Sequence, residues 1–163
     1  MIYKTFYNSP IGLIEISGTE NSITSLYFLD EEFNPESKSN LYLEKCVEQL
    51  DEYFKGKRKI FELNLQLEGS EFQKKVWNEL LKIPYGETKS YMEITKILGD
   101  TKAIRAVANA NGQNKISIII PCHRVIGSDG SLTGYGGGLW RKKWLLEHEQ
   151  NFSNSEKQLE LSL

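Results

Sequence analysis

The first thirty residues alternate between apolar and polar side chains, and turn-forming residues interrupt the alternation. The segments "MIYKTFY", "IGLIEIS" and "SITSLYFL" are separated by "NSP" and "GTEN". This period of two predicts three short strands joined by tight turns in an antiparallel meander. Leu43, Val47, Leu50 and Phe54 then recur at helical spacing and predict a helix over residues 41–54. The segment "IFELNLQLEG" alternates again, which predicts either a further strand or an extended linker.

From residue 70 onward the apolar positions recur at helical spacing, and the starts of two helices are marked by capping residues. Ser70 with Gln73, and Ser90 with Glu93, have the spacing of a capping box. Gly99 suits the position just past the end of the second helix, where the chain needs a left-handed conformation.

The segment "DTKAIRAVANANG" predicts a third helix, which begins at Asp100 or Thr101 and ends near Gly112. Two helices joined by a short turn that contains glycine are typical of a helix-turn-helix. We expect this third helix to turn three residues to the core and to present a polar face flanked by small residues. The expected core residues are Ile104, Val107 and Ala108, the outer face carries Lys102, Arg105 and Asn109, and the small residues are Ala103, Ala106 and Ala110.

The last part of the chain begins with "KISIII", a β-branched run that leads into Pro121. The segment "VIGSDGSLTGYGGG" predicts a glycine-rich hairpin or loop, and "LWRKKWLLEHE" predicts a final helix. The apolar residues of that helix are expected on its inner face: Leu139, Trp140, Trp144 and Leu145. Residues 151–163 are expected to form a polar tail.

The composition is typical of a soluble globular protein of one or two domains, with 163 residues, 39% hydrophobic and 26% charged. Two cysteines cannot form a disulfide framework, so a reducing compartment is expected. The chain shows neither the pattern of a signal peptide nor an apolar run of the ~18 residues that a membrane span needs. We therefore expect a cytoplasmic protein without a membrane partner.

The net charge of −2 conceals an asymmetry along the chain. Residues 1–69 carry 7 Lys and Arg against 12 Asp and Glu, whereas residues 70–148 carry 12 against 7. The first segment is therefore acidic, with a net charge of −5, and the second is basic, with +5. This pattern indicates that only the second segment binds a polyanion, although a chance segregation of solvated charge gives the same totals.

The stretch "IIIPCHRVIG" contains one of the two cysteines and one of the two histidines, side by side. Cys122 is either a buried structural thiol or a nucleophile, and a nucleophile needs a base or a positive field. Neighbours in an extended strand point to opposite faces, so His123 can assist Cys122 only if the chain turns sharply after Pro121 or if water bridges them. A carboxylate that orients the imidazole can come from Glu147 or Glu149, between which the residues do not decide.

The other candidates are less specific when taken one at a time. Arg105 lies on the outer face of a helix with small neighbours, a face that can approach a nucleic-acid groove or simply be solvated. Tyr91 and Tyr135 can donate hydrogen bonds or stack on a base, or can serve only in the core. No metal site is expected, because the cysteines and histidines lack paired zinc spacings: Cys46, Cys122, His123 and His148.

Four pieces occur in a specific order: a helix-turn-helix, "IIIPCHRVIG", "TGYGGG" and "WLLEHE". In this order, from about Glu71 to Glu149, the chain resembles the O6-alkylguanine-DNA alkyltransferases, the methylated-DNA–protein-cysteine methyltransferases. The resemblance implies an α+β fold with two domains. Residues 1–69 would form a ribonuclease-H-like domain with a small antiparallel sheet and a helix. Residues 70–150 would form a mostly helical DNA-binding and alkyl-acceptor domain, followed by the tail, residues 151–163.

The resemblance also implies a role for each matching residue. Cys122 stands at the alkyl-acceptor position, His123 where a histidine polarises the thiol through a water, and Glu149 where a glutamate orients the imidazole. Tyr91 matches a tyrosine that helps to neutralise the departing guanine and to rotate the nucleotide. Asn114 matches an asparagine that braces the segment before the active site.

Further matching residues are implied at the surface for DNA and guanine. Arg105 matches an arginine that fills the gap left by the extruded base, and Tyr135 belongs to the loop that walls the guanine. Gly136 stands in the same loop where some relatives carry a hydroxyl residue. Ala106 and Arg124 are also expected to contact the substrate or DNA.

The implied activity is DNA repair by irreversible transfer of an alkyl group from O6-alkylguanine in DNA to a cysteine of the protein, once per molecule and without a cofactor. The implied partner is double-stranded DNA bound through its minor groove with the damaged base flipped out, and the implied state is a monomer. The helix-turn-helix alone would have favoured the major groove. Two other classes remain possible from the residues: a DNA module that binds lesions without repairing them, and a cysteine hydrolase.

Overall fold

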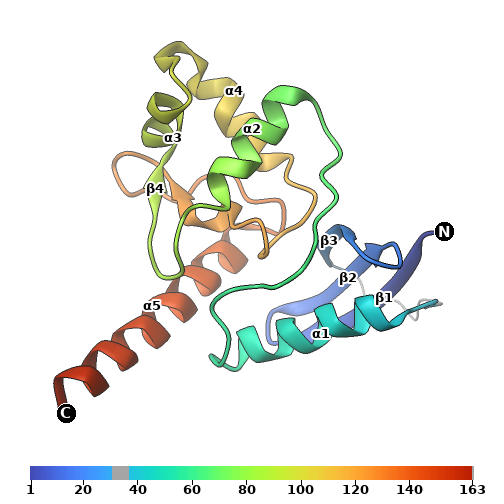
Figure 1. Ribbon diagram of the computed structural model, residues 1–163. Helices are drawn as coiled ribbons and strands as arrows, with labels where there is room; N and C mark the ends of the chain where they lie inside the picture. Colours follow the sequence, from blue (N-terminus) through green and yellow to red (C-terminus); the bar gives the residue numbers. More distant parts are fainter. Residues whose placement is uncertain (31–36, 163) are drawn as a thin grey trace. The chain divides into compact units, whose positions relative to one another are not determined.

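The computed structural model describes residues 1–30 and 37–162, with side chains through residue 153 (Figure 1). The chain divides into two compact units. The first comprises Met1–Gly69 and Lys115–Ile119, and the second comprises Ser70–Asn114 and Ile120–Leu163. The segment 115–119 therefore leaves the basic half of the chain and packs with the acidic half.

The first unit is built on the predicted meander of three antiparallel strands, β1 (Tyr3–Ser9), β2 (Gly12–Gly18) and β3 (Ile23–Leu29), in that order. The turn between β1 and β2 needs a glycine because Gly12 has a φ of 118°. Alternate apolar side chains of β2 and β3 form the core of the sheet: Ile14, Ile16, Ile23 and Leu26 are fully buried.

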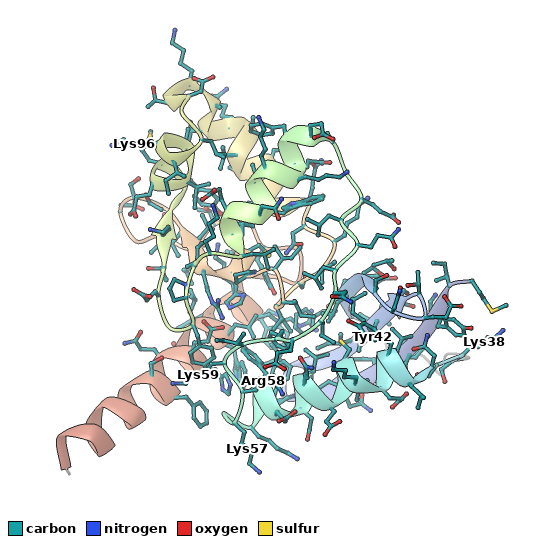
Figure 2. All side chains as sticks on the ribbon, viewed as in Figure 1. Lys38, Tyr42, Lys57, Arg58, Lys59 and Lys96 are labelled. Carbon is teal, nitrogen blue, oxygen red and sulfur yellow. The ribbon has the colours of Figure 1, made fainter. Side chains whose placement is uncertain are left out.

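The helix α1 (Leu41–Phe54) has the bounds that the apolar spacing predicted and packs against β1 and β2. Asn40 caps its start by accepting a hydrogen bond from the Leu43 amide. Leu43, Leu50 and Tyr53 are fully buried on its inner face. Figure 2 shows Lys57, Arg58 and Lys59 at the turn that follows this helix.

The segment after that turn is extended and does not form a regular strand. The Gln49 side chain holds it in place, since its amide donates to the Glu62 carbonyl at 3.2 Å and its oxygen accepts from the Glu62 amide at 2.9 Å. Ile23 of β3 makes one parallel bridge, to Leu65. Of the two predictions for this segment, the extended linker is therefore the better description.

The β-branched run before Pro121 also contributes a single bridge instead of a strand. Leu26 donates to the Lys115 carbonyl and accepts from the Ser117 amide, both at 2.9 Å, so this segment extends the sheet at β3. The run then bends, because Ile118 has a φ of 71°. A β-branched residue rarely adopts this left-handed conformation, so the tertiary structure must hold the bend in place.

The second unit contains the predicted helices α2 (Glu71–Leu80), α3 (Tyr91–Ile97) and α4 (Ile104–Gly112). Both predicted capping boxes are formed, at the starts of α2 and α3. A short 3₁₀ turn, η1 (Thr101–Ala103), precedes α4, and α3 packs against α4. The predicted helix-turn-helix is therefore present.

The inner face of α4 differs in part from the predicted one. Val107, Ala110 and Asn111 are buried, and the Trp77 indole donates to the Ala110 carbonyl at 2.9 Å. Ala108, which we expected in the core, is exposed. Its place is taken by Ala110 and Asn111, which lie one helical turn after Val107. The predicted outer face is exposed, including Lys102, Arg105, Ala106 and Asn109.

The long helix α5 (Leu139–Ser162) follows a two-stranded parallel sheet of β4 (Lys89–Ser90) and β5 (Val125–Ile126), and its backbone remains helical through the predicted tail. The prediction that Leu139 and Trp140 face inward was wrong, because their exposed fractions are 49% and 57%. The buried stripe is mostly polar instead: Arg141, Lys142, Leu145, His148 and Glu149. Among the described residues, no helix is long and apolar enough to cross a membrane.

Two glycines of the helix-turn-helix give a matched test of backbone strain. Gly99 has a φ of 88° and Gly112 is helical, and an added Cβ would meet no atom within 4 Å at either position. We expect Gly99→Ala to lower the free energy of unfolding by ~1 kcal/mol, because a side chain disfavours the left-handed conformation. Gly112→Ala is the control and should be neutral or stabilising by up to about 1 kcal/mol. Urea unfolding of both variants measures the difference, and an equal change in both would contradict it.

Candidate active site

Cys122 lies in a tight turn that the preceding proline introduces. The 3₁₀ turn η2 (Cys122–Arg124) is closed by a hydrogen bond of 2.9 Å from the Arg124 amide to the Pro121 carbonyl. Cys122 is 4% exposed and His123 is fully buried. The sharp turn after Pro121 that an active cysteine–histidine pair would need is therefore present.

The carboxylate that meets His123 comes from α5. Nε2 of His123 lies 2.7 Å from Oε2 of Glu149, and both side chains are buried. Glu147, the other candidate, is exposed and lies 3.9 Å from the Lys143 ammonium. The helical spacing explains the difference, because Glu149 falls on the buried stripe with Leu145 and Glu147 does not.

The same carboxylate binds the guanidinium of Arg124 in a bidentate pair. Nε of Arg124 donates to Oε1 at 2.8 Å and Nη2 donates to Oε2 at 3.0 Å. The backbone amide of Gly86 also donates to Oε1, at 3.2 Å. Burial alone would raise the pKa of Glu149, but the contacts with His123 and Arg124 outweigh it and hold that pKa below its usual value. Glu149 is therefore ionised at any physiological pH.

Arg124 itself does not lie where we expected it. Its third donor, Nη1, reaches the Ile83 carbonyl at 2.7 Å, and the residue is 7% exposed. All three of these donor groups are engaged inside the second unit. This placement does not fit a direct contact with DNA and instead joins Arg124 to the His123–Glu149 pair.

Burial and nearby charge keep the imidazole of His123 neutral. Burial lowers its pKa, Glu149 opposes that change, and the charges of Arg124 and Lys142 lower it further. With the Nε2 proton directed at an ionised carboxylate, Nδ1 is left as an acceptor. Within the described part of the chain, Nδ1 is buried and has no hydrogen-bond partner. The imidazole can therefore accept a proton at Nδ1.

The thiol of Cys122 experiences opposing effects. Burial raises its pKa, while a hydrogen bond from the Asn114 side chain and the charge of Lys142 lower it. Asn114 also donates to the Ile120 carbonyl at 2.8 Å, so it braces the segment that leads into Cys122. By contrast, burial raises the pKa of the other thiol, Cys46, to about 12 without a compensating contact. Burial is the larger effect, so the pKa of Cys122 stays above its ordinary value, while Asn114 and Lys142 offset part of the effect of burial at Cys122.

The sequence analysis missed Lys142, a buried lysine of α5. Its Nζ donates to the Thr133 carbonyl at 2.9 Å and lies 5.7 Å from the centre of the Tyr91 ring. Burial lowers the pKa of Lys142 to about 8, although the attraction of Cys122 opposes this change. Helical spacing counted back from Glu149 through Leu145 reaches Lys142, so the placement of Glu149 on the inner face was the signal that could have found it.

Tyr91 donates to the same carbonyl of the glycine-rich loop as Lys142. The Tyr91 hydroxyl donates to the Thr133 carbonyl at 3.0 Å, and burial raises its pKa, so the hydroxyl keeps its proton. Tyr135 is half-buried with a buried hydroxyl, and Gly136 is exposed in the same loop. Arg105 and Ala106 are exposed on α4 and take no part in these contacts.

The described residues contain no group of three or more His, Cys, Asp or Glu side chains that could hold a metal ion. The arrangement around Cys122 is that of an assisted nucleophile: a thiol, a neutral base, a buried carboxylate and two further donors, Lys142 and Tyr91.

Comparison with known proteins identifies both units. Residues 71–151 match the DNA-binding domain of 6-O-methylguanine DNA methyltransferase, and residues 2–67 match its ribonuclease-like domain. A methylated-DNA–protein-cysteine methyltransferase of Mycolicibacterium paratuberculosis is 47% identical over 155 residues, which are 93% of each chain. A constitutive enzyme of the same name from Bacillus subtilis is 41% identical over 165 residues, 96% of this chain and all of that one.

Solved structures of O6-methylguanine methyltransferases are also similar to this chain. The crystal structure of Mycobacterium tuberculosis O6-methylguanine methyltransferase superposes with a TM-score of 0.84 at 44% identity and covers 93% of this chain and 94% of that one. The structure of Mycobacterium tuberculosis OGT in complex with DNA superposes with a TM-score of 0.83 at 44% identity and covers 93% of each chain. The α+β fold predicted from the resemblance is confirmed. The chain belongs to the family of methylated-DNA–protein-cysteine methyltransferases, which repair O6-alkylguanine in DNA by transferring its alkyl group to a cysteine of their own.

Proposed function

We propose that Cys122 is the cysteine that accepts the alkyl group and that His123, Glu149, Asn114, Tyr91 and Lys142 assist the transfer. The observation that supports this assignment best is the buried contact of 2.7 Å between Glu149 and His123, the residue that follows Cys122 in the turn η2. Cys46, the second thiol of the chain, lies buried in α1 of the other unit with no base beside it in the contacts described.

The transfer begins with removal of the thiol proton. Nδ1 of His123 accepts this proton, through a water molecule where the two atoms are not in direct contact, and Glu149 stabilises the imidazolium that results. The charge of Lys142 and the hydrogen bond from Asn114 stabilise the thiolate. Each of these groups acts on a charge that appears during the reaction, which is the condition for catalysis.

The thiolate then attacks the alkyl carbon in line with the bond from that carbon to guanine O6. The S–C bond forms, the C–O bond breaks, and its electron pair leaves with guanine. Tyr91 donates a hydrogen bond that offsets the charge on the departing base, which its raised pKa allows because the hydroxyl is still protonated. The product is an S-alkylcysteine, a thioether that no group in the site can hydrolyse, so each molecule reacts once.

The damaged base must leave the double helix to reach a sulfur that is 4% exposed. We propose that α4 enters the minor groove with its exposed face of Arg105, Ala106 and Asn109. Small side chains allow a close approach to the groove, and Arg105 can fill the space that the base leaves. The loop with Tyr135 and Gly136 would then enclose the guanine. The net charge of +5 over residues 70–148 favours binding to the phosphates.

We further propose that the protein acts as a monomer in a reducing compartment such as the cytoplasm. One thiol reacts once with one lesion, so the chemistry needs no second subunit. A reducing compartment keeps Cys122 as a thiol, and both cysteines are free.

Incubation with duplex DNA that contains O6-methylguanine should add the mass of one methyl group to the protein. Peptide mapping should place it on Cys122, and Cys122→Ala should bind the lesion without gaining mass. Cys46→Ala is the control and should react at the wild-type rate, because its thiol has a pKa of about 12. A modified peptide with Cys46, or repeated turnover as expected of a hydrolase, would contradict the assignment.

Removal of the Arg105 side chain should impair base extrusion and leave the chemistry intact. We expect Arg105→Ala to slow transfer from duplex DNA by ~10- to 100-fold, because extrusion costs a few kcal/mol. The same variant should react with free O6-alkylguanine base within about twofold of wild type. Lys96→Ala, an exposed lysine of α3 that Figure 2 labels, is the charge control. Equal losses on duplex and free base would remove the proposed role of Arg105.

The charge of Lys142 should matter only while the side chain is protonated. The pKa of about 8 lies below the ordinary 10.5, so Lys142 is charged at pH 7 and loses its charge as the pH rises past 8. Lys142→Met should therefore slow transfer by ~10-fold or more at pH 7, where it removes a charge that favours the thiolate, and by much less at pH 9.5. Single-turnover rates from pH 6 to 9.5 measure this difference. Lys143→Met, exposed on the same helix, is the control. A loss for Lys142→Met that is constant with pH would show that the side chain only supports packing.

A further inference from the structure

Arg124 is buried beside the His123–Glu149 pair, and in the described contacts its guanidinium is directed at groups of the protein interior and not at the thiol. It is 7% exposed, and three of its donor groups are directed at Glu149 and at the Ile83 carbonyl. Its Cζ also lies 5.7 Å from the centre of the Tyr85 ring. The proposed mechanism assigns no step to this residue.

We propose that Arg124 is a positioning residue for alkyl transfer: it fixes the carboxylate of Glu149 and shares its negative charge, so that His123 remains a neutral base. This inference rests on the proposed function of Cys122 and His123. It concerns the residue that acts on the histidine through the glutamate.

The geometry of the carboxylate supports the positioning part. Oε1 of Glu149 accepts from Nε of Arg124 and from the Gly86 amide, while Oε2 accepts from Nη2 of Arg124 and meets Nε2 of His123. Four contacts on two oxygens leave the carboxylate no freedom to rotate. The guanidinium is itself anchored by the Ile83 carbonyl at 2.7 Å. The imidazole therefore meets an acceptor in a fixed position, which keeps its proton on Nε2 and leaves Nδ1 as the acceptor for the thiol proton.

The charges around the imidazole support the second part. Glu149 and Lys142 reach it from α5, and Cys122 and Arg124 reach it from its own turn. Glu149 is the only one of these groups whose negative charge is permanent, and Arg124 neutralises it at close range. The imidazole consequently faces a paired carboxylate instead of a free one.

A buried carboxylate without a positive partner is strongly unfavourable. If Arg124 is removed, the nearest group that can supply positive charge to Glu149 is His123, 2.7 Å away, by taking up a proton. The histidine would then be an imidazolium before the reaction starts, and an imidazolium cannot accept the proton of Cys122. The arginine thus decides whether the histidine serves as a base or as a counter-ion.

The test compares Arg124→Gln and Arg124→Lys with wild type by two measurements. The first is the titration of the His123 ring by NMR, which is simple to assign because the chain has two histidines and His148→Asn removes the other signal. The second is the single-turnover rate of methyl transfer from pH 5 to 9. We expect Arg124→Gln to raise the pKa of His123, and the midpoint of the acidic limb of the rate profile, by at least ~1 pH unit. Arg124→Lys keeps the charge but loses the bidentate geometry and should give a smaller shift in the same direction.

Arg58→Gln provides a matched control in the other unit. Arg58 also combines a carboxylate and a carbonyl partner, since it lies 3.5 Å from Glu52 and donates to the Ile60 carbonyl at 2.8 Å (Figure 2). Its variant should leave the titration of His123 and the rate profile unchanged. The double variant Arg124→Gln/Glu149→Gln removes both charges and should reverse the upward shift of His123.

A fall in rate that is equal at every pH, with the titration of His123 unmoved in the folded Arg124 variants, would overturn the proposal and leave Arg124 a purely structural role. If Arg124→Gln does not fold, Arg124→Lys decides by the same criterion. The NMR titration does not depend on alkyl transfer. A methyl group found on a residue other than Cys122 would therefore refute the proposed function, while the effect of Arg124 on the titration of His123 could still be measured.

Discussion

The second unit depends on one buried carboxylate. Glu149 is 1% exposed and its charge must be matched inside the protein, which ties together three segments that are distant in sequence. His123 and Arg124 come from the turn η2, Gly86 comes from the segment between α2 and α3, and Ile83 from that segment accepts from the arginine. The contacts that orient the histidine therefore also join α5 to the turn η2. Stability and reactivity at this site cannot be separated by removing Glu149, because its loss leaves Arg124 buried without a counter-charge.

The thiol of Cys122 differs from the carboxylate of Glu149, because its surroundings do not keep it ionised. Cys122 is buried, and burial raises the pKa of its thiol, so it favours the neutral thiol over the thiolate that would attack the alkyl group. Two groups offset part of the effect of burial without exposing the sulfur, namely the Asn114 amide and the ammonium of Lys142. Lys142 is itself destabilised in its charged form, because burial lowers its pKa to about 8. A more exposed lysine would hold its charge more firmly but would act on the sulfur through water, where the interaction is far weaker.

Local sequence rules predicted the parts of the fold that are governed by local physics. The meander, the bounds of α1, both capping boxes and the left-handed Gly99 all follow from side-chain spacing and backbone preference. The rules failed on α5, where they placed Leu139 and Trp140 inside, because the hydrophobic pattern assumes that buried positions are apolar. Here the buried stripe carries polar residues whose partners lie outside the stripe, such as His123 and Arg124 for Glu149 and the Thr133 carbonyl for Lys142. The bend at Ile118 was equally out of reach, since a β-branched run gives no local signal for a left-handed residue.

The Thr133 carbonyl accepts hydrogen bonds from two buried donors, Tyr91 and Lys142, in the absence of a guanine base. It accepts from the Tyr91 hydroxyl at 3.0 Å and from the Lys142 ammonium at 2.9 Å. A buried donor without a partner would cost about 1–3 kcal/mol, so both groups need an acceptor in the absence of substrate. If Tyr91 turns to an incoming guanine, it exchanges one acceptor for another, while Lys142 can keep its bond to Thr133. The exchange costs little, because the hydroxyl is hydrogen-bonded before and after it. If Tyr91 has the proposed role, the loop carbonyl substitutes for the guanine acceptor until the alkylated base enters.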